Sequence, residues 1–232
     1  MNANVAPTLC DTPAGKLAAH LRGHGDSPAP RGPYTMDMLA DDTAAVMDAL
    51  GIRRAHYVGL SIGGMSGVGL ALRHPERLMS ALLCDMRADT PPAASAPWNE
   101  RIALAEANGN CSALAKPTID RWFGRPFLDG HVEIERRFVD TAAATKPEGF
   151  IGCARAIQGM DYLAAVANIK TPTGLIVGAN DAVLPAAMTA LHASIQGSTL
   201  DVIPDAGHLP NIDQPAAFDA ALLRHFERVA PR

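Results

Sequence analysis

The sequence predicts an α/β protein built on a mostly parallel sheet. Short apolar strand patterns alternate with amphipathic helical patterns along most of the chain, which is the order that parallel sheets require. One block in the middle is helical only, and it indicates an insertion into that order. The 232 residues, 48% of them hydrophobic, are enough to bury one sizeable core. We therefore expect one α/β domain with an inserted helical subdomain.

The first elements form a helix, a strand and a second helix. Residues 35–50 carry apolar side chains at helical spacing, with Thr35 as a candidate N-cap and Gly51 as a stop. Residues 55–60, AHYVGL, then predict a short buried strand, and residues 63–74 predict a glycine-rich helix. This order places a sharp strand-to-helix turn directly after the strand.

A second buried strand, residues 78–84, precedes a break in the alternation. Residues 87–97, RADTPPAASAP, predict a flexible linker because proline and small residues dominate them. Only helical patterns follow until strand character returns, which indicates a helical cap. We expect a cap over residues 87–168, inserted into a core of residues 1–86 and 169–232.

The last part of the chain returns to the α/β order. Residues 173–180 and 199–203 predict two more strands, with a helix over residues 185–196 between them. Residues 214–229 predict a closing amphipathic helix.

Charge and leader signals exclude several classes of protein. The net charge is −4, from 20 basic and 24 acidic residues, and neither sign forms a block, so we expect a small-molecule partner and no nucleic-acid or membrane partner. The start of the chain lacks the pattern of a signal peptide, and no apolar run has transmembrane length, so we expect a cytoplasmic protein.

The cysteines predict neither a disulfide framework nor a zinc site. They are widely scattered, without a C-x-x-C pattern or metal-ligand spacing, and we expect four reduced thiols: Cys10, Cys84, Cys111 and Cys153.

A serine lies between glycines at the first strand-to-helix turn. The stretch Gly59-Leu60-Ser61-Ile62-Gly63 has the spacing of a nucleophile elbow, in which both glycines relieve crowding around a strained serine. A plain turn or helix start is the alternative for the motif alone. The rest of the chain has to supply a base and an acid.

Candidates for both follow the later strands. Asp181 stands at the exit of the strand predicted over residues 173–180. His208 lies in the loop after the strand predicted over residues 199–203. The chain order Ser, Asp, His fits a triad in which His208 removes the proton of Ser61 and Asp181 orients the imidazole and stabilises its charged form.

The competing residues have ordinary structural interpretations. His24 lies on a loop, where we favour a structural role, and His56 belongs to a strand. Asp205 and Asp213 flank His208 and could replace Asp181, but we expect them to be turn or cap residues. The remaining histidines lie in helical or surface patterns: His20, His74, His192 and His225.

Four segments resemble the α/β-hydrolase superfamily, closest to 3-oxoadipate enol-lactonase-like esterases. They are LRGHGDSPAPRGPYT, HYVGLSIGGM, VGANDAVLP and DAGHLPNIDQP, and the resemblance spans roughly residues 20 to 228. It implies the α/β-hydrolase fold, with Ser61 as nucleophile, Asp181 as acid, His208 as base and the backbone N–H of Ile62 as one oxyanion donor. It also implies that Trp122, in RWFGRPF, lines an acyl or lactone pocket, with ordinary helix packing as the alternative.

The resemblance implies a serine carboxylic-ester hydrolase. Small esters or lactones would react through an acyl-enzyme, without a metal or an organic cofactor. A dehalogenase is disfavoured, because that branch has an aspartate where this chain has Ser61. A cofactor-free perhydrolase or haloperoxidase activity stays open, as does a catalytically weak or silent protein that only binds a ligand.

The chain departs from the family pattern at its start. The family usually begins with three further strands, and the loop after the third supplies a second oxyanion donor; residues 1–19 show no such strand. The Gly23-His24-Gly25 stretch corresponds to a later turn. Without these strands, the strand over residues 55–60 becomes an edge for which residues 16–21 are a weak substitute, so we expect a homodimer that covers it.

Overall fold

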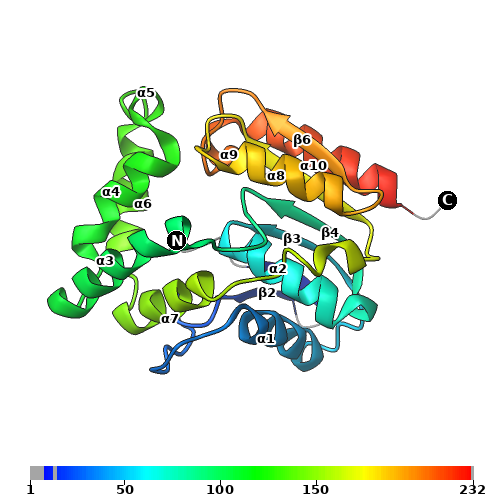
Figure 1. Cartoon of the computed structure of the whole chain (residues 1–232), viewed down its shortest axis with the longest axis horizontal. Helices are drawn as coiled ribbons and strands as arrows, with labels where there is room; N and C mark the ends of the chain where they lie inside the picture. Colours follow the sequence, from blue (N-terminus) through cyan, green and yellow to red (C-terminus); the bar gives the residue numbers. More distant parts are fainter. Residues whose placement is uncertain (1–7, 13–14, 231–232) are drawn as a thin grey trace. The chain divides into compact units, whose positions relative to one another are not determined.

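Four parallel strands form the central sheet of the chain. The computed structural model describes residues 8–12 and 15–230. The sheet has the order β3-β4-β5-β6, and Figure 1 labels β3, β4 and β6. The strands are β3 (Ala55–Leu60), β4 (Leu78–Cys84), β5 (Thr173–Gly178) and β6 (Thr199–Ile203). The predicted parallel sheet is confirmed.

Helices cover both faces of this sheet. The elements concerned are α2 (Ile62–Arg73), η1 (Pro75–Arg77), η2 (Val166–Asn168), α8 (Leu184–Ser194), α9 (Pro210–Asp213) and α10 (Pro215–Val229). α2 packs on β3 and β4, and α10 packs on β4, β5 and β6. Leu82 belongs to the core cluster under α10, whereas Leu83 lies against Gly67 of α2. Because neighbouring residues of a strand point to opposite faces, α2 and α10 cover opposite sides of the sheet.

The chain divides into two compact units. One contains the four-stranded sheet and consists of Thr43–Asp89 and the described residues from Asp161 onward. The other consists of the described residues up to Asp42 together with Thr90–Met160. The outer ends of the predicted core, residues 1–7 and 231–232, lie outside the described residues.

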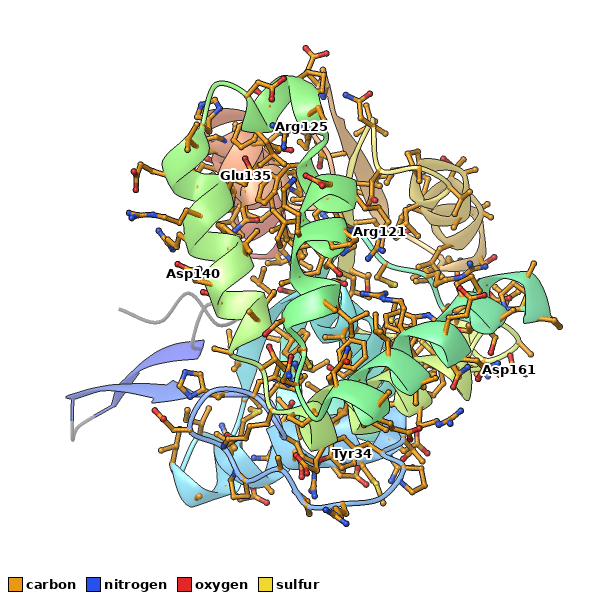
Figure 2. The ribbon with its side chains drawn as sticks, turned by 90° about the vertical axis from the view of Figure 1, so that its left-hand side faces the viewer. Tyr34, Arg121, Arg125, Glu135, Asp140 and Asp161 are labelled. Atoms are coloured by element: carbon orange, nitrogen blue, oxygen red, sulfur yellow. The ribbon has the colours of Figure 1, made fainter. Side chains whose placement is uncertain are left out.

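The second of these units is mainly helical. Its helices are α3 (Pro92–Asn108), α4 (Ser112–Phe123), α5 (Arg125–Leu128), α6 (Val132–Ala143) and α7 (Pro147–Gln158). α4 packs on α6 and α3 packs on α7. Arg125 and Glu135 face one another from neighbouring helices (Figure 2), and the guanidinium Nη1 donates to Oε1 at 3.0 Å. Helices α3 to α7 lie between β4 and β5 in the chain, as the helical patterns predict.

The predicted flexible linker over residues 87–97 is wrong in its second half. Helix α3 begins at Pro92, with Pro91 at its N-cap. Proline is well tolerated in the first helical turn, where its missing N–H has no intrahelical acceptor. Pro97 lies inside the helix. The alanines around these prolines favour a helix, but the prolines led to the prediction of a linker.

Residues 1–19 contain two strands, but among the described residues neither belongs to the main sheet, in agreement with the expectation that the family's usual strands are missing there. β1 (Thr8–Thr12) and β2 (Gly15–Ala19) form an antiparallel two-stranded sheet of their own. A local hairpin pairs within a few residues and needs no long apolar run, so its strand pattern is weak. β2 pairs with β1 and does not join the four-stranded sheet, in which β3 is the terminal strand.

Helix α1 (Met36–Ala49) agrees with the prediction at both ends. The backbone N–H of Met38 donates to Oγ1 of Thr35 at 3.1 Å, which makes Thr35 the expected N-cap. Gly51 follows the helix with a φ of 67°. Within the part of the chain that the structure describes, no helix is both long and apolar enough to cross a membrane.

The cysteines agree with the prediction wherever their side chains are described. Cys84, Cys111 and Cys153 are buried and form no disulfide. The side chain of Cys10 lies outside the described part of the structure.

Candidate active site

The turn between β3 and α2 holds Ser61 in a strained backbone conformation. Its φ is 56° and its ψ is −121°, a region that residues with a side chain rarely adopt. Two backbone bonds fix the turn: the N–H of Ser61 donates to the carbonyl of Cys84, and the N–H of Met65 donates to the carbonyl of Ser61, both at 2.9 Å. The serine is therefore held at the carboxyl end of β3, at the start of a helix, as a nucleophile elbow requires.

Of the two glycines that flank Ser61, only one occupies a position where a side chain would not fit. A Cβ on Gly59 would overlap the backbone carbonyl of Gly63 and the ring of Tyr57. A Cβ on Gly63 would meet only the Tyr57 hydroxyl, at 3.9 Å. The expectation that both glycines relieve crowding therefore holds for Gly59 and is wrong for Gly63.

Ser61, His208 and Asp181 form one hydrogen-bonded chain. Nε2 of His208 lies 2.9 Å from Oγ of Ser61, and Nδ1 lies 2.7 Å from Oδ2 of Asp181. The side chains of His208 and Asp181 are each 11% exposed, so water reaches them little. With Nδ1 protonated and donating to Asp181, Nε2 is free to accept the proton of Ser61. The geometry supports proton removal from the serine hydroxyl.

Residues with a strained, positive φ lie after the carboxyl ends of the four strands. Of the described residues other than glycine, four have a positive φ. One follows each strand of the sheet: Ser61 follows β3, Asp85 follows β4, Ala182 follows β5 and Asp205 follows β6. Strain of this kind persists where the surrounding structure fixes the backbone, and it is common at functional sites. The strain thus marks the edge of the sheet where Ser61, Asp181 and His208 meet.

The loop that carries His208 is tied to its surroundings from two sides. Oδ2 of Asp213 accepts the backbone N–H of Gly207 at 2.7 Å. A Cβ on Gly178, at the end of β5, would overlap the carbonyl of Gly207, so the two backbones approach closely there. Asp205 is exposed in the turn after β6. Asp205 therefore lies in a turn, as expected, whereas Asp213 supports the loop of His208, a role that was not predicted.

A further aspartate, Asp85, lies near Asp181 and Asp213. It is 0% exposed, and its Oδ1 accepts the backbone N–H of Gly178 at 2.8 Å. Burial, above all, raises the pKa of Asp85 to about 9, and the nearby carboxyls of Asp181 and Asp213 add to that rise. No sequence motif singles out Asp85; the one available signal is an acidic residue directly after a buried strand.

The other predicted residues lie where the sequence places them. Ile62 is the first residue of α2, and the N–H groups of a first helical turn have no intrahelical acceptor. Trp122 is half-buried in α4, in the helical unit. Nδ1 of His24 lies 3.2 Å from the carbonyl of Arg22, in a turn, which fits the structural role expected for that histidine.

The comparisons with known proteins agree with this fold. The model of the Alpha/beta hydrolase family matches residues 12–221. 3-Oxoadipate enol-lactonase 2 from Acinetobacter baylyi is 34% identical over 202 residues, which cover 87% of this chain and 74% of that protein.

Solved structures show the same likeness. A hydrolase from Pseudomonas aeruginosa PA01 superimposes with a TM-score of 0.85 at 36% identity, over 91% of this chain and 80% of that one. A thermophilic esterase from Thermogutta terrifontis, solved with malate bound, has a TM-score of 0.85 at 30% identity, over 91% and 79%.

Proposed function

The chain belongs to the α/β-hydrolase family, and we propose that it is a serine hydrolase of small carboxylic esters or lactones. The observation that carries the proposal is the hydrogen-bonded chain from Oγ of Ser61 through His208 to Asp181, with separations of 2.9 and 2.7 Å. The strained turn presents Ser61 at its start, as a nucleophile on an elbow would be presented.

In the first half of the reaction, an acyl-enzyme forms. His208 takes the proton of Ser61 while Oγ attacks the ester carbonyl, and Asp181 stabilises the imidazolium that results. The tetrahedral intermediate collapses, the bond to the leaving oxygen breaks, and His208 gives its proton to that oxygen. For a lactone, the leaving oxygen stays attached to the acyl group through the opened ring.

In the second half, water replaces the leaving group. His208 removes a proton from the water as its oxygen attacks the acyl carbonyl. The second intermediate releases the carboxylic acid, and the proton returns to Ser61. No metal or organic cofactor takes part in these steps.

The developing oxyanion is stabilised in part by the first turn of α2. We propose the N–H of Ile62 as one donor, because it belongs to the residue after the nucleophile and lies at a helix N-terminus. A second donor is not assigned. Loss of one oxyanion donor in a protease costs about 10² to 10³ in kcat, so turnover is expected to be modest if Ile62 acts alone.

The names of two similar proteins support the proposed substrate class. One is an enol-lactonase and another is an esterase, and a lactone is an ester closed into a ring, so one triad serves both. We further propose that the helical unit acts as a cap and that Trp122 lines the acyl or lactone pocket, and that both substrate and enzyme are cytoplasmic.

Hydrolysis of p-nitrophenyl acetate and of a small γ-lactone tests the proposal, with Ser61→Ala as the control. We expect both reactions to require Ser61. A protein that binds either compound without turning it over would be the silent ligand-binding protein instead. Halogenation with hydrogen peroxide in place of hydrolysis would indicate the cofactor-free haloperoxidase, which uses the same three residues.

The edge of the four-stranded sheet at β3 supports a proposal about the assembly of the protein. β3 is the terminal strand of its sheet among the described residues, and Val58 at its centre is 45% exposed. An unpaired strand edge is a template for pairing with another chain. We propose that a second copy of the protein covers it, as a homodimer.

A further inference from the structure

We propose that Asp85 is a protonated carboxylic acid that donates a hydrogen bond to Asp181 and so acts as a positioning residue for the triad. The proton itself is inferred from buried geometry. Its catalytic consequence rests on the proposed function, in which Asp181 is the carboxylate that stabilises the imidazolium of His208.

Only one of the two carboxyl oxygens of Asp85 accepts a hydrogen bond. Oδ1 accepts the N–H of Gly178 at 2.8 Å, and the backbone N–H of Asp85 donates to the carbonyl of Ile176 at 2.9 Å. The other carboxyl oxygen, Oδ2, is buried, and no donor reaches it. An ionised carboxylate with a bare, buried oxygen is costly, because burial removes its water without replacing it.

The neighbours of Asp85 make a negative charge there still less favourable. The titratable groups that face it are the carboxyls of Asp181 and Asp213 and the thiol of Cys84. None of these is a cation. Asp181 lies within hydrogen-bonding range of Asp85, and two carboxyls can share a hydrogen bond only when one of them carries a proton.

The proton belongs on Asp85 because the two aspartates have different surroundings. Asp181 has Nδ1 of His208 at 2.7 Å and is 11% exposed, so the N–H of His208 and some water stabilise its charge. Asp85 is 0% exposed and has only one backbone donor to its carboxyl. Burial as the first cause raises the pKa of Asp85 to about 9, which is the direction that this difference requires.

A neutral acid at this position has a clear use. It donates to Asp181 without adding a second negative charge beside it, so Asp181 remains an anion in an orientation that serves His208. Asp85 directly follows β4 and has a positive φ of 47°.

Carbon-13 NMR of the wild-type protein tests the proton directly. The side-chain carboxyl carbon of Asp85 can be assigned through bonds to the amide of Met86, so no variant is needed. At pH 7 we expect it at the chemical shift of a protonated acid, with a titration only at alkaline pH, and the carbon of Asp181 at the shift of a carboxylate. A carboxylate shift for Asp85 at pH 7, or a protonated Asp181, would overturn the proposal.

This measurement does not depend on esterase activity. A failed hydrolysis assay would remove the proposed function while leaving the proton on Asp85 in place. An ionised Asp85 in an active esterase would remove the inference alone.

Two substitutions test the consequence for the triad. Asp85→Asn keeps the acceptor for Gly178 and offers an amide N–H to Asp181, and asparagine tolerates a positive φ. We expect kcat within about threefold of wild type and an unchanged midpoint of the pH–rate profile, because no charge changes. If Asp85 were ionised, the substitution would remove a negative charge and lower that midpoint by about one unit.

Asp85→Gly removes the carboxyl without straining the backbone. We expect it to lower kcat by about 10- to 100-fold, the equivalent of one hydrogen bond to a charged group, with KM little changed. Equal losses in Asp85→Asn and Asp85→Gly would show that neutrality and the donated hydrogen bond are not what matters.

Discussion

At the scale of single residues, two glycines of one motif have different physical roles. A Cβ on Gly59 would overlap the backbone of Gly63, whereas a Cβ on Gly63 would have room. The carbonyl of Gly63 also accepts the hydroxyl of Tyr57 at 2.7 Å, which pins the first turn of α2. The motif spacing alone treats the two positions as equal.

Substitution of each glycine by alanine separates these roles. Gly59→Ala should lower the free energy of unfolding by about 1–3 kcal/mol or more, because backbone has to move to admit the methyl group. Gly63→Ala, the matched control, should be neutral or stabilising by up to about 1 kcal/mol, because alanine favours a helix. Urea denaturation of both variants measures the difference, and equal losses would contradict it.

The proton transfer at His208 has its own signature in the pH dependence of kcat/KM. A protonated imidazole cannot accept the proton of Ser61, so kcat/KM should rise with pH in one transition as the imidazole loses its proton. The pH–rate profile with p-nitrophenyl acetate measures this transition. A flat profile from acid to alkaline pH would exclude a histidine base.

At the scale of elements, α10 holds a histidine whose burial links stability to pH. His225 is 3% exposed, and its Nε2 lies 2.9 Å from Oγ of Ser80 on β4. Burial first, and the charge of Arg228 next, lower the pKa of His225 to about 4. At pH values between about 4 and the ordinary pKa of histidine, His225 binds a proton in the unfolded chain but not in the folded chain.

Stability should therefore fall as pH falls from about 6.5 to about 4. The loss that His225 causes is about 3 kcal/mol over this window. In His225→Gln, the free energy of unfolding should depend less steeply on pH there, while His192→Gln, at an exposed position of α8, should behave as wild type. Denaturation at several pH values measures both, and parallel curves for all three proteins would rule out this role.

The elements also show what the sequence could predict. The strands over residues 55–60, 78–84 and 199–203 have the predicted bounds, because apolar runs between turn signals leave little choice. The start of α3 could not be predicted, because proline disrupts the interior of a helix but is tolerated in the first turn, and the sequence alone does not distinguish the two positions. The hairpin β1–β2 was concealed because its pairing is local and its strands lack an apolar run.

The same limit applies to the site. Ser61, Asp181 and His208 stand at strand exits in a chain order that a known triad uses, so their meeting could be predicted from the sequence. Asp85 stands at the same kind of position, but its importance depends on burial and on a missing donor at Oδ2, and neither can be read from sequence.

At the scale of the whole molecule, the edge of the sheet leads to a prediction about assembly. β3 ends the sheet at one side among the described residues, and β6 ends it at the other. A homodimer that covers β3 should persist on dilution and weaken in Val58→Lys, because a charge on an edge strand opposes pairing. Val202→Lys, at an exposed position of β6, is the matched control. Light scattering over a dilution series measures the mass, and an active monomer at every concentration would refute the dimer.

The most direct test of Ser61 as the nucleophile is covalent labelling with a fluorophosphonate, which reacts with an activated serine. Intact-protein mass spectrometry should show one label on each chain, and peptide mapping should locate it on Ser61. Ser61→Ala should take up no label and lose nearly all turnover, and adding His208→Ala to it should cause no further loss, because the two residues act as one unit. A label on another residue, or more than a few per cent of turnover in Ser61→Ala, would contradict the assignment.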